Sequence, residues 1–153
     1  MPADVDFNRL YLLADMHRVV PLIADAVINC VFAPDEIKVK FKKELFKVSM
    51  RYETQMKEKD ALTKLFNEQG IKHFFLKGHK LSRFYKKPEQ RFMLDMDIWV
   101  EKNRVRDAQQ ILENRGYEKN SFDDDKDIGY IKKPFLNIEI HKELKYDYDK
   151  GYE

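Results

Sequence analysis

Three acidic side chains, Asp95, Asp97 and Glu139, are the residues of this 153-residue chain best suited to chemistry. The segment 92–100 alternates apolar with other residues, which predicts a strand with Asp95 and Asp97 on one face. Two like charges so close together are costly beside a core unless a cation or a basic group neutralises them. Carboxylate oxygens suit Mg²⁺ or Mn²⁺, so the pair predicts a divalent-metal site. A solvated edge strand with alternating acids is the alternative.

Glu139 lies in a second predicted strand, 135–140, and shares its face with His141. A third carboxylate on a separate strand would complete a two-metal cluster, with the ions about 4 Å apart. His141 either orients this carboxylate or binds substrate, or it packs without a functional role. Trp99 is on the predicted face of the aspartates, where it either stacks on a base or packs beneath a helix, the commoner use of tryptophan.

A candidate phosphate-binding turn lies upstream, where Lys77, Gly78 and Lys80 follow one predicted strand and open a short helix. Glycine lets the backbone approach a phosphate, and a helix N-terminus offers unpaired N–H groups. Lys77, Lys80 and Arg91 could add charge-assisted contacts to phosphate oxygens. This turn, together with Glu139, favours the metal-site interpretation of Asp95 and Asp97 over a solvated edge strand.

The elements that must position these residues follow from hydrophobic periodicity and from glycine and proline. Helices are predicted over about 7–20, 21–32, 35–69, 79–85 and 104–115, and strands over 71–76, 92–100, 117–122, 128–131 and 135–140. This order predicts an α+β fold with a mixed sheet. We expect a helical N-terminal region, 1–69, followed by an α/β core, 70–153. The acidic run 123–127 is expected to form a turn rather than a calcium loop.

Composition narrows the class of protein. The 29 basic and 27 acidic residues leave a net charge of +2, so no global field for nucleic-acid binding is expected, although local patches are compatible with it. The single cysteine, Cys30, excludes an internal disulfide and is expected to be a buried thiol. No signal peptide and no apolar run of about 18 residues is present, which predicts a cytoplasmic protein without a membrane span.

The combined motifs resemble the polymerase-beta-like nucleotidyltransferase superfamily, which has a glycine after a strand, an Asp-x-Asp pair and a further acid between apolar residues. The stretches FLKGHKLSRFY, RFMLDMDIWV, ILENRGY and IEIH look like a bacterial branch of largely uncharacterised nucleotidyltransferase-like proteins. The match covers about residues 70–142. It implies a nucleotidyltransferase-like mixed β-sheet flanked by helices.

The resemblance also implies roles for residues. Asp95, Asp97 and Glu139 would be the catalytic metal ligands, and Gly78 with the following helix turn would hold phosphates. The superfamily usually has serine after this glycine, where its hydroxyl touches a phosphate. His79 stands in that place here, so either His79 or Lys80 replaces the serine or the site takes a different phosphate geometry.

The hypothesis that follows is transfer of a nucleoside monophosphate from a nucleoside triphosphate such as ATP to a hydroxyl acceptor, with Mg²⁺ or Mn²⁺ as cofactor. The acceptor is a small molecule, RNA or a protein. A non-catalytic nucleotide- or metal-binding module, regulatory or antitoxin-like, is the alternative, and a nucleotide-sugar glycosyltransferase ranks last. No closing element is predicted after His141, which is typical of a fragment of a longer enzyme, and exposed apolar surface near the cleft would then favour a homo-oligomer.

Overall fold

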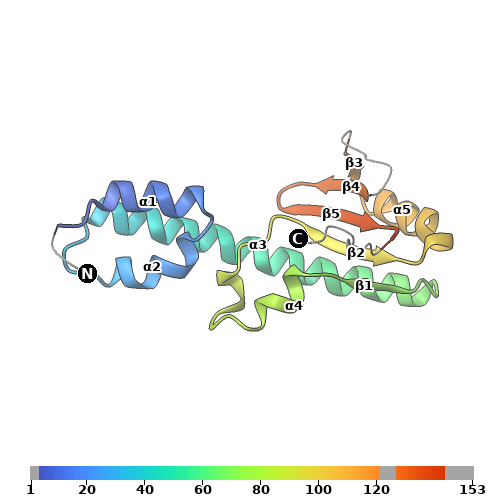
Figure 1. Cartoon of the computed structure of the whole chain (residues 1–153). Coiled ribbons are helices and arrows are strands. Elements are labelled where there is room, and N and C mark those ends of the chain that lie inside the picture. The colour runs from blue at the N-terminus through green and yellow to red at the C-terminus, as the bar shows by residue number, and fades with distance from the viewer. Residues whose placement is uncertain (1–3, 121–126, 144–153) are drawn as a thin grey trace, which may run out of the picture. The chain divides into compact units, whose positions relative to one another are not determined.

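The computed structural model describes residues 4–120 and 127–143 and divides into two compact units. A helical unit comprises residues 1–56 and 78–94, and a sheet unit comprises residues 57–77 and 95–153. Helix α3 (Asp35–Glu68) supplies residues to both units (Figure 1). The division at residue 70 that we expected between a helical region and a core stays a prediction.

The helical unit is built from α1 (Phe7–Met16), α2 (Val20–Ile28), the first part of α3, the short α4 (Gly78–Ser82) and a 3-10 turn (Pro88–Gln90). Asp6 caps α1 through a 3.0 Å hydrogen bond from the backbone N–H of Arg9. Pro21 stands in the first turn of α2, where its missing N–H costs no hydrogen bond. Cys30 is buried in the core of this unit, as predicted. None of the helices in the described ranges is both long and apolar enough to cross a membrane.

The sheet unit contains a five-stranded sheet in the order β1-β2-β5-β4-β3. The strands are β1 (His73–Phe75), β2 (Met96–Val100), β3 (Glu118–Lys119), β4 (Asp127–Lys132) and β5 (Leu136–His141). Strands β2 and β5 are parallel, whereas the other neighbours are antiparallel. The predicted α+β class and mixed sheet flanked by helices are therefore confirmed.

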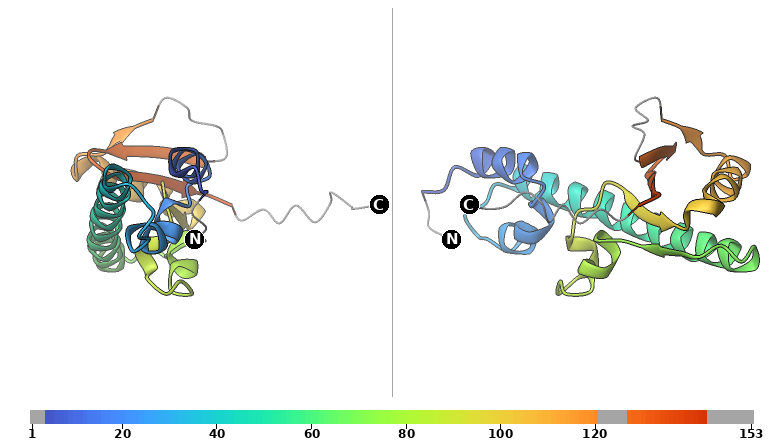
Figure 2. Two further views of the ribbon diagram at one scale, coloured as in Figure 1. Left: turned by 90° about the vertical axis from the view of Figure 1, so that its left-hand side faces the viewer. Right: turned by 45° about the vertical axis from the view of Figure 1, so that its right-hand side comes forward.

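One face of this sheet packs into the hydrophobic core of the unit. Alternate residues of β2, β4 and β5 are buried against the last turns of α3 and against α5 (Val105–Asn114), and two further views show these elements (Figure 2). The fully buried strand side chains include Met96, Ile98, Ile138 and Ile140. Each contributes about 1.5–3 kcal/mol of burial free energy. Because side chains alternate, the residues between them lie on the opposite face.

Three observed strands are shorter than predicted, and β1 comprises only His73–Phe75 of the predicted 71–76. Strand β2 begins at Met96 rather than near residue 92, since its first partner across the ladder is Ile138. Asp95 therefore precedes the strand. Strand β3 has only two residues, and the remainder of the predicted strand 117–122 lies partly outside the described residues. The predicted acidic turn also lies outside them, except for Asp127, which begins β4.

Candidate metal centre and phosphate turn

Asp97 and Glu139 lie side by side on the face of the sheet opposite the core. They are register partners in the parallel pair β2–β5, and both are partly buried. His141, two residues beyond Glu139 on the same face, completes a group in which one ligand atom from each residue lies within 4.8 Å of the others. These three donors could hold one divalent cation.

Asp95 acts on this group through its charge, although it is outside the strand. The pKa of Glu139 is raised, first because burial disfavours its charged form and next because Asp95 and Asp97 repel it. The charge of His141 lowers the pKa of Glu139 and so opposes these effects. Both aspartates therefore repel Glu139, and a cation beside Glu139 would relieve that repulsion.

His141 is held by carboxylates on both sides of its ring. Its Nε2 lies 2.8 Å from Oδ1 of Asp97, and its Nδ1 lies 2.7 Å from Oδ1 of Asp127. The hydrogen bond to Asp97 is the main cause of a raised His141 pKa, burial opposes it, and Asp127 adds to the rise. A carboxylate accepts hydrogen bonds, so each contact is a hydrogen bond where the facing ring nitrogen carries a proton, which depends on the tautomer of His141. Sequence reasoning missed Asp127, because it placed that residue in a turn.

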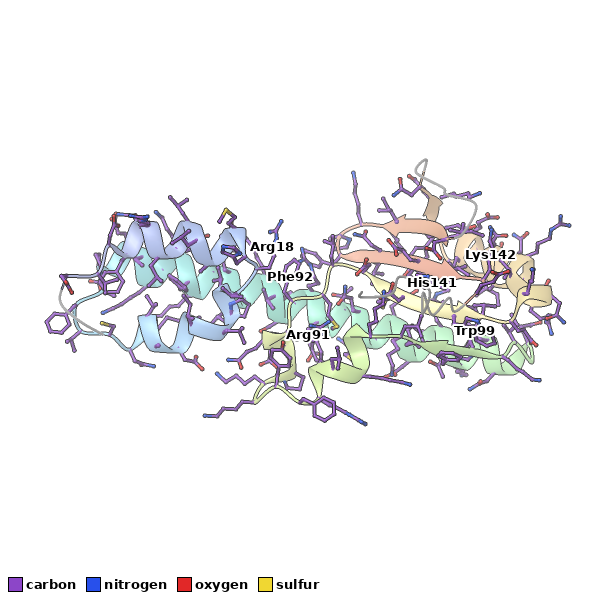
Figure 3. All side chains as sticks on the ribbon, viewed as in Figure 1. Arg18, Arg91, Phe92, Trp99, His141 and Lys142 are labelled. Carbon is purple, nitrogen blue, oxygen red and sulfur yellow. The ribbon has the colours of Figure 1, made fainter. Side chains whose placement is uncertain are left out.

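Trp99 is partly buried and lies on the face of the sheet opposite the core. It is the register partner of His141 on one side and of Phe74 on the other. The rings of Phe74 and Trp99 are stacked, with centroids 4.8 Å apart. Both residues line a hollow of about 390 Å³ at the β1 edge. Figure 3 labels Trp99 and His141. An aromatic surface thus adjoins the candidate metal centre.

The backbone of the glycine turn is left-handed at one residue. Lys77, not Gly78, has the positive φ, at 37°. The N–H of the preceding Leu76 donates to the backbone carbonyl of Asp97 at 2.8 Å, which connects the start of the turn to β2. Gly78 then opens α4, which is only five residues long and includes His79 and Lys80. The dipole of so short a helix is small, so phosphate binding there would depend mainly on side-chain charge.

Gly78 also has a packing reason to be glycine. A Cβ at this position would lie 2.8 Å from the sulfur of Met93, whose side chain is buried. We predict that Gly78→Ala lowers the free energy of unfolding by about 1–3 kcal/mol, the usual cost of overpacking. Urea unfolding of the variant and the wild type measures this difference in the free energy of unfolding. In the Met93→Ala background the added methyl group should cost less, and an equal cost in both backgrounds would contradict the clash.

Sequence reasoning missed Arg18 and Arg51, two arginines of the helical unit that contact one aromatic ring. The guanidinium carbons of Arg18 and Arg51 lie 5.3 and 4.9 Å from the ring centroid of Phe92. Burial lowers the pKa of Arg51, and the charge of Arg18 lowers it further. Next to Phe92, Arg91 has a buried Nε without a hydrogen-bond partner among the described residues (Figure 3). The signal available in the sequence was only Arg91 beside an aromatic residue.

The sequence-predicted site residues are thus distributed over both units. The sheet unit contains Asp95, Asp97, Glu139 and Lys77, and the charges of both aspartates act on Glu139. Four others belong to the helical unit, namely Gly78, His79, Lys80 and Arg91. The three predicted metal ligands therefore all belong to the sheet unit, whereas the predicted phosphate-binding residues are divided between the two units.

Comparisons with known proteins identify a family. The sequence model of a family described as "Uncharacterised nucleotidyltransferase" matches residues 3–152. No curated protein matches the chain. Among solved structures, the chain is similar to the lincomycin-bound crystal structure of the lincosamide antibiotic adenylyltransferase LnuA. The identity is 18% and the TM-score 0.46, and the match covers 56% of this chain and 53% of that one. The matched region thus spans about half the length of that structure.

Proposed function

The chain belongs to the family of uncharacterised nucleotidyltransferases, and on this premise we propose that it transfers a nucleoside monophosphate from a nucleoside triphosphate to a hydroxyl acceptor. The observation that carries the proposal is the group of three carboxylates on and beside β2 and β5. Asp97 and Glu139 are neighbours in register, and Asp95 and Asp97 both raise the pKa of Glu139. Like charges gathered at a partly buried position destabilise a fold unless they serve a cation.

Asp97 and Glu139 fit a divalent cation, and in this proposal Asp95 is the third ligand. The donors are carboxylate oxygens with ligand atoms close enough to share one ion, since those of Asp97 and Glu139 lie within 4.8 Å of each other. When bound, Mg²⁺ or Mn²⁺ would supply positive charge to the phosphates and lower the pKa of the attacking hydroxyl.

The reaction is an in-line displacement at the α-phosphorus. The acceptor oxygen forms the new P–O bond, the bond from the α-phosphorus to the bridging oxygen breaks, and pyrophosphate leaves with that electron pair. Glu139 is the candidate base for the hydroxyl proton, because its carboxylate is partly buried and is the register neighbour of Asp97 at the proposed centre.

Phosphate contacts are assigned in this proposal to Lys77, Lys80 and Arg91, with Gly78 and His79 between the two lysines. Lysine and arginine donate charge-assisted hydrogen bonds to phosphate oxygens and offset their charge. The nucleobase and the acceptor are not specified by these contacts. We therefore propose nucleotidyl transfer as the reaction and leave the acceptor unspecified.

The test is a thermal-shift screen of nucleoside triphosphates, each with Mg²⁺, with Mn²⁺ or with neither. We expect stabilisation that requires both metal and nucleotide, because ligand binding to the folded state raises its stability by about 2.7 kcal/mol at 100 times Kd. Incorporation of label from the stabilising nucleotide into candidate hydroxyl acceptors then tests transfer. Stabilisation by nucleotide without metal, and without transfer, would instead support a non-catalytic binding module.

A further inference from the structure

The ring of His141 has an unusual position for a histidine that only packs. Its side chain is 14% exposed, and each ring nitrogen contacts a different carboxylate, Asp97 at 2.8 Å and Asp127 at 2.7 Å. These residues come from three adjacent strands, β2, β5 and β4. Asp127, His141 and Asp97 are therefore connected across the face of the sheet opposite the core, and the connection ends at the candidate metal centre.

The sheet register explains why these residues meet. Strands β2 and β5 are parallel, which places Asp97 beside Glu139. His141 lies on the same face two residues further along β5, where its register partner is Trp99. Strand β4 is antiparallel to β5, so Asp127 is the direct partner of His141. Directly paired residues have Cβ atoms about 4.5–5.5 Å apart, within reach of a carboxylate–imidazole contact. Three hydrogen-bonded strands fix this geometry.

We propose that Nε2 of His141 is a metal ligand beside Asp97 and Glu139, that Asp127 orients the imidazole, and that the centre prefers Mn²⁺ to Mg²⁺. The inference rests on the proposed function and identifies the ion that this site takes. Its geometric basis is that one ligand atom from each of Asp97, Glu139 and His141 lies within 4.8 Å of the others.

The chemistry of the donors gives the preference. Mg²⁺ is bound through oxygen and usually keeps several waters, whereas imidazole nitrogen suits first-row transition metals, and carboxylates suit Mn²⁺ as well. A metal-bound histidine commonly donates its other N–H to a carboxylate, which fixes the tautomer and turns the free nitrogen toward the ion. Asp127 is placed to accept that N–H from Nδ1, leaving Nε2 for the metal.

Pulsed electron paramagnetic resonance of the full chain loaded with Mn²⁺ tests the ligand directly. We expect couplings from ¹⁴N in the wild-type protein and their loss in His141→Gln, which keeps a side-chain hydrogen-bond donor but has no imidazole. His17→Gln is the matched control, because His17 is exposed and belongs to the helical unit. Bound Mn²⁺ without nitrogen coupling, or coupling that persists in His141→Gln, would overturn the inference and leave the proposed transferase function standing.

Metal selectivity provides the second measurement. Trp99 is the single tryptophan and the register partner of His141, so quenching of its fluorescence should report Mn²⁺ binding. We expect the Mn²⁺ affinity to fall about 10- to 100-fold in Asp127→Asn, the usual loss when the carboxylate that orients a ligating histidine is altered, and at least as much in His141→Gln, which removes the ligand. The Mg²⁺ affinity, measured by competition, should change much less. Equal losses for both ions would refute the preference, and failure of the wild type to bind either ion would refute the metal centre as a whole.

Discussion

Replacing Asp95 and Asp97 together by asparagine is expected to abolish nucleotidyl transfer while the protein stays folded. The amide side chains have nearly the same size as the carboxylates but carry no charge to hold a cation or to balance the charge that develops in the transition state. Removing one electrostatic contact from an active site typically costs about 10²–10³-fold in rate, so losing two carboxylates should cost about 10³-fold or more. Stability should change little, because the substitution also removes two repulsive charges from the neighbourhood of Glu139.

The control must remove two charges from the same unit without touching the centre. Asp60→Asn with Asp107→Asn does so, since the side chains of Asp60 and Asp107 are 78% and 54% exposed. Rates of transfer and thermal unfolding, measured for both double variants, separate catalysis from folding. Transfer by the Asp95→Asn, Asp97→Asn protein at a rate close to that of the wild type would refute the assignment.

Alternation along the chain was sufficient to predict much of this site. It put Asp97 and Trp99 on one face of a strand and Glu139 and His141 on one face of another, and the sheet has both arrangements. The reason is physical, because a strand with one buried face has its register fixed by its apolar residues. Ile98 and Ile140 are fully buried, so the polar residues between them must lie on the other face.

Other parts of the site depend on pairing between distant segments, which periodicity does not encode. Nothing local indicates that β2 and β5 are parallel or that Asp127 pairs with His141. Alternation also overextended the strand around Asp95, because a strand needs a hydrogen-bonded neighbour as well as a pattern. The left-handed conformation of Lys77 was missed for a related reason, since glycine is the residue expected to adopt it.

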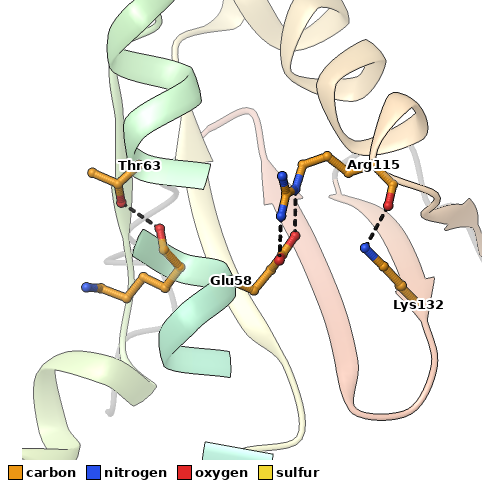
Figure 4. A network of polar contacts seen from close by, with 5 residues as sticks. Glu58, Thr63, Arg115 and Lys132 are labelled. Atoms are coloured by element: carbon orange, nitrogen blue, oxygen red, sulfur yellow. Dashed lines mark hydrogen bonds and ion pairs between the residues drawn. The ribbon is translucent and has the colours of Figure 1, made fainter. Parts of the chain in front are cut away.

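On the core side of the sheet, one ion pair joins α3 to the end of α5 (Figure 4). Arg115 donates to Glu58 through Nε at 2.8 Å and through Nη2 at 2.7 Å, and the Glu58 side chain is only 10% exposed. The backbone carbonyl of Arg115 also accepts a hydrogen bond from Nζ of Lys132 in β4 at 2.7 Å. Helix, helix end and strand are thus connected at one point on the core side of the sheet.

Replacing Arg115 by methionine is expected to lower the free energy of unfolding by about 3 kcal/mol, because it leaves the Glu58 carboxylate buried without its partner. Burial raises the pKa of Glu58, but the hydrogen bond and charge of Arg115, with smaller contributions from Lys132 and Tyr117, together lower the net pKa. A lowered folded-state pKa stabilises the protein above the ordinary value of 4.5 and loses that effect as the pH falls. The difference between wild type and variant should therefore be full at neutral pH and shrink below pH 4.5.

Chemical denaturation of three variants separates a lost partner from a lost contact. Glu58→Met combined with Arg115→Met should cost less than Arg115→Met alone, because apolar residues often replace a buried ion pair at little cost. Lys64→Met is the control, since the Lys64 and Glu68 side chains of its ion pair are 77% and 54% exposed, and such a pair contributes at most about 0.5 kcal/mol. If the double variant were less stable than Arg115→Met, the ion pair would have a net stabilising role that desolvation does not cancel, and our expectation for this contact would be wrong.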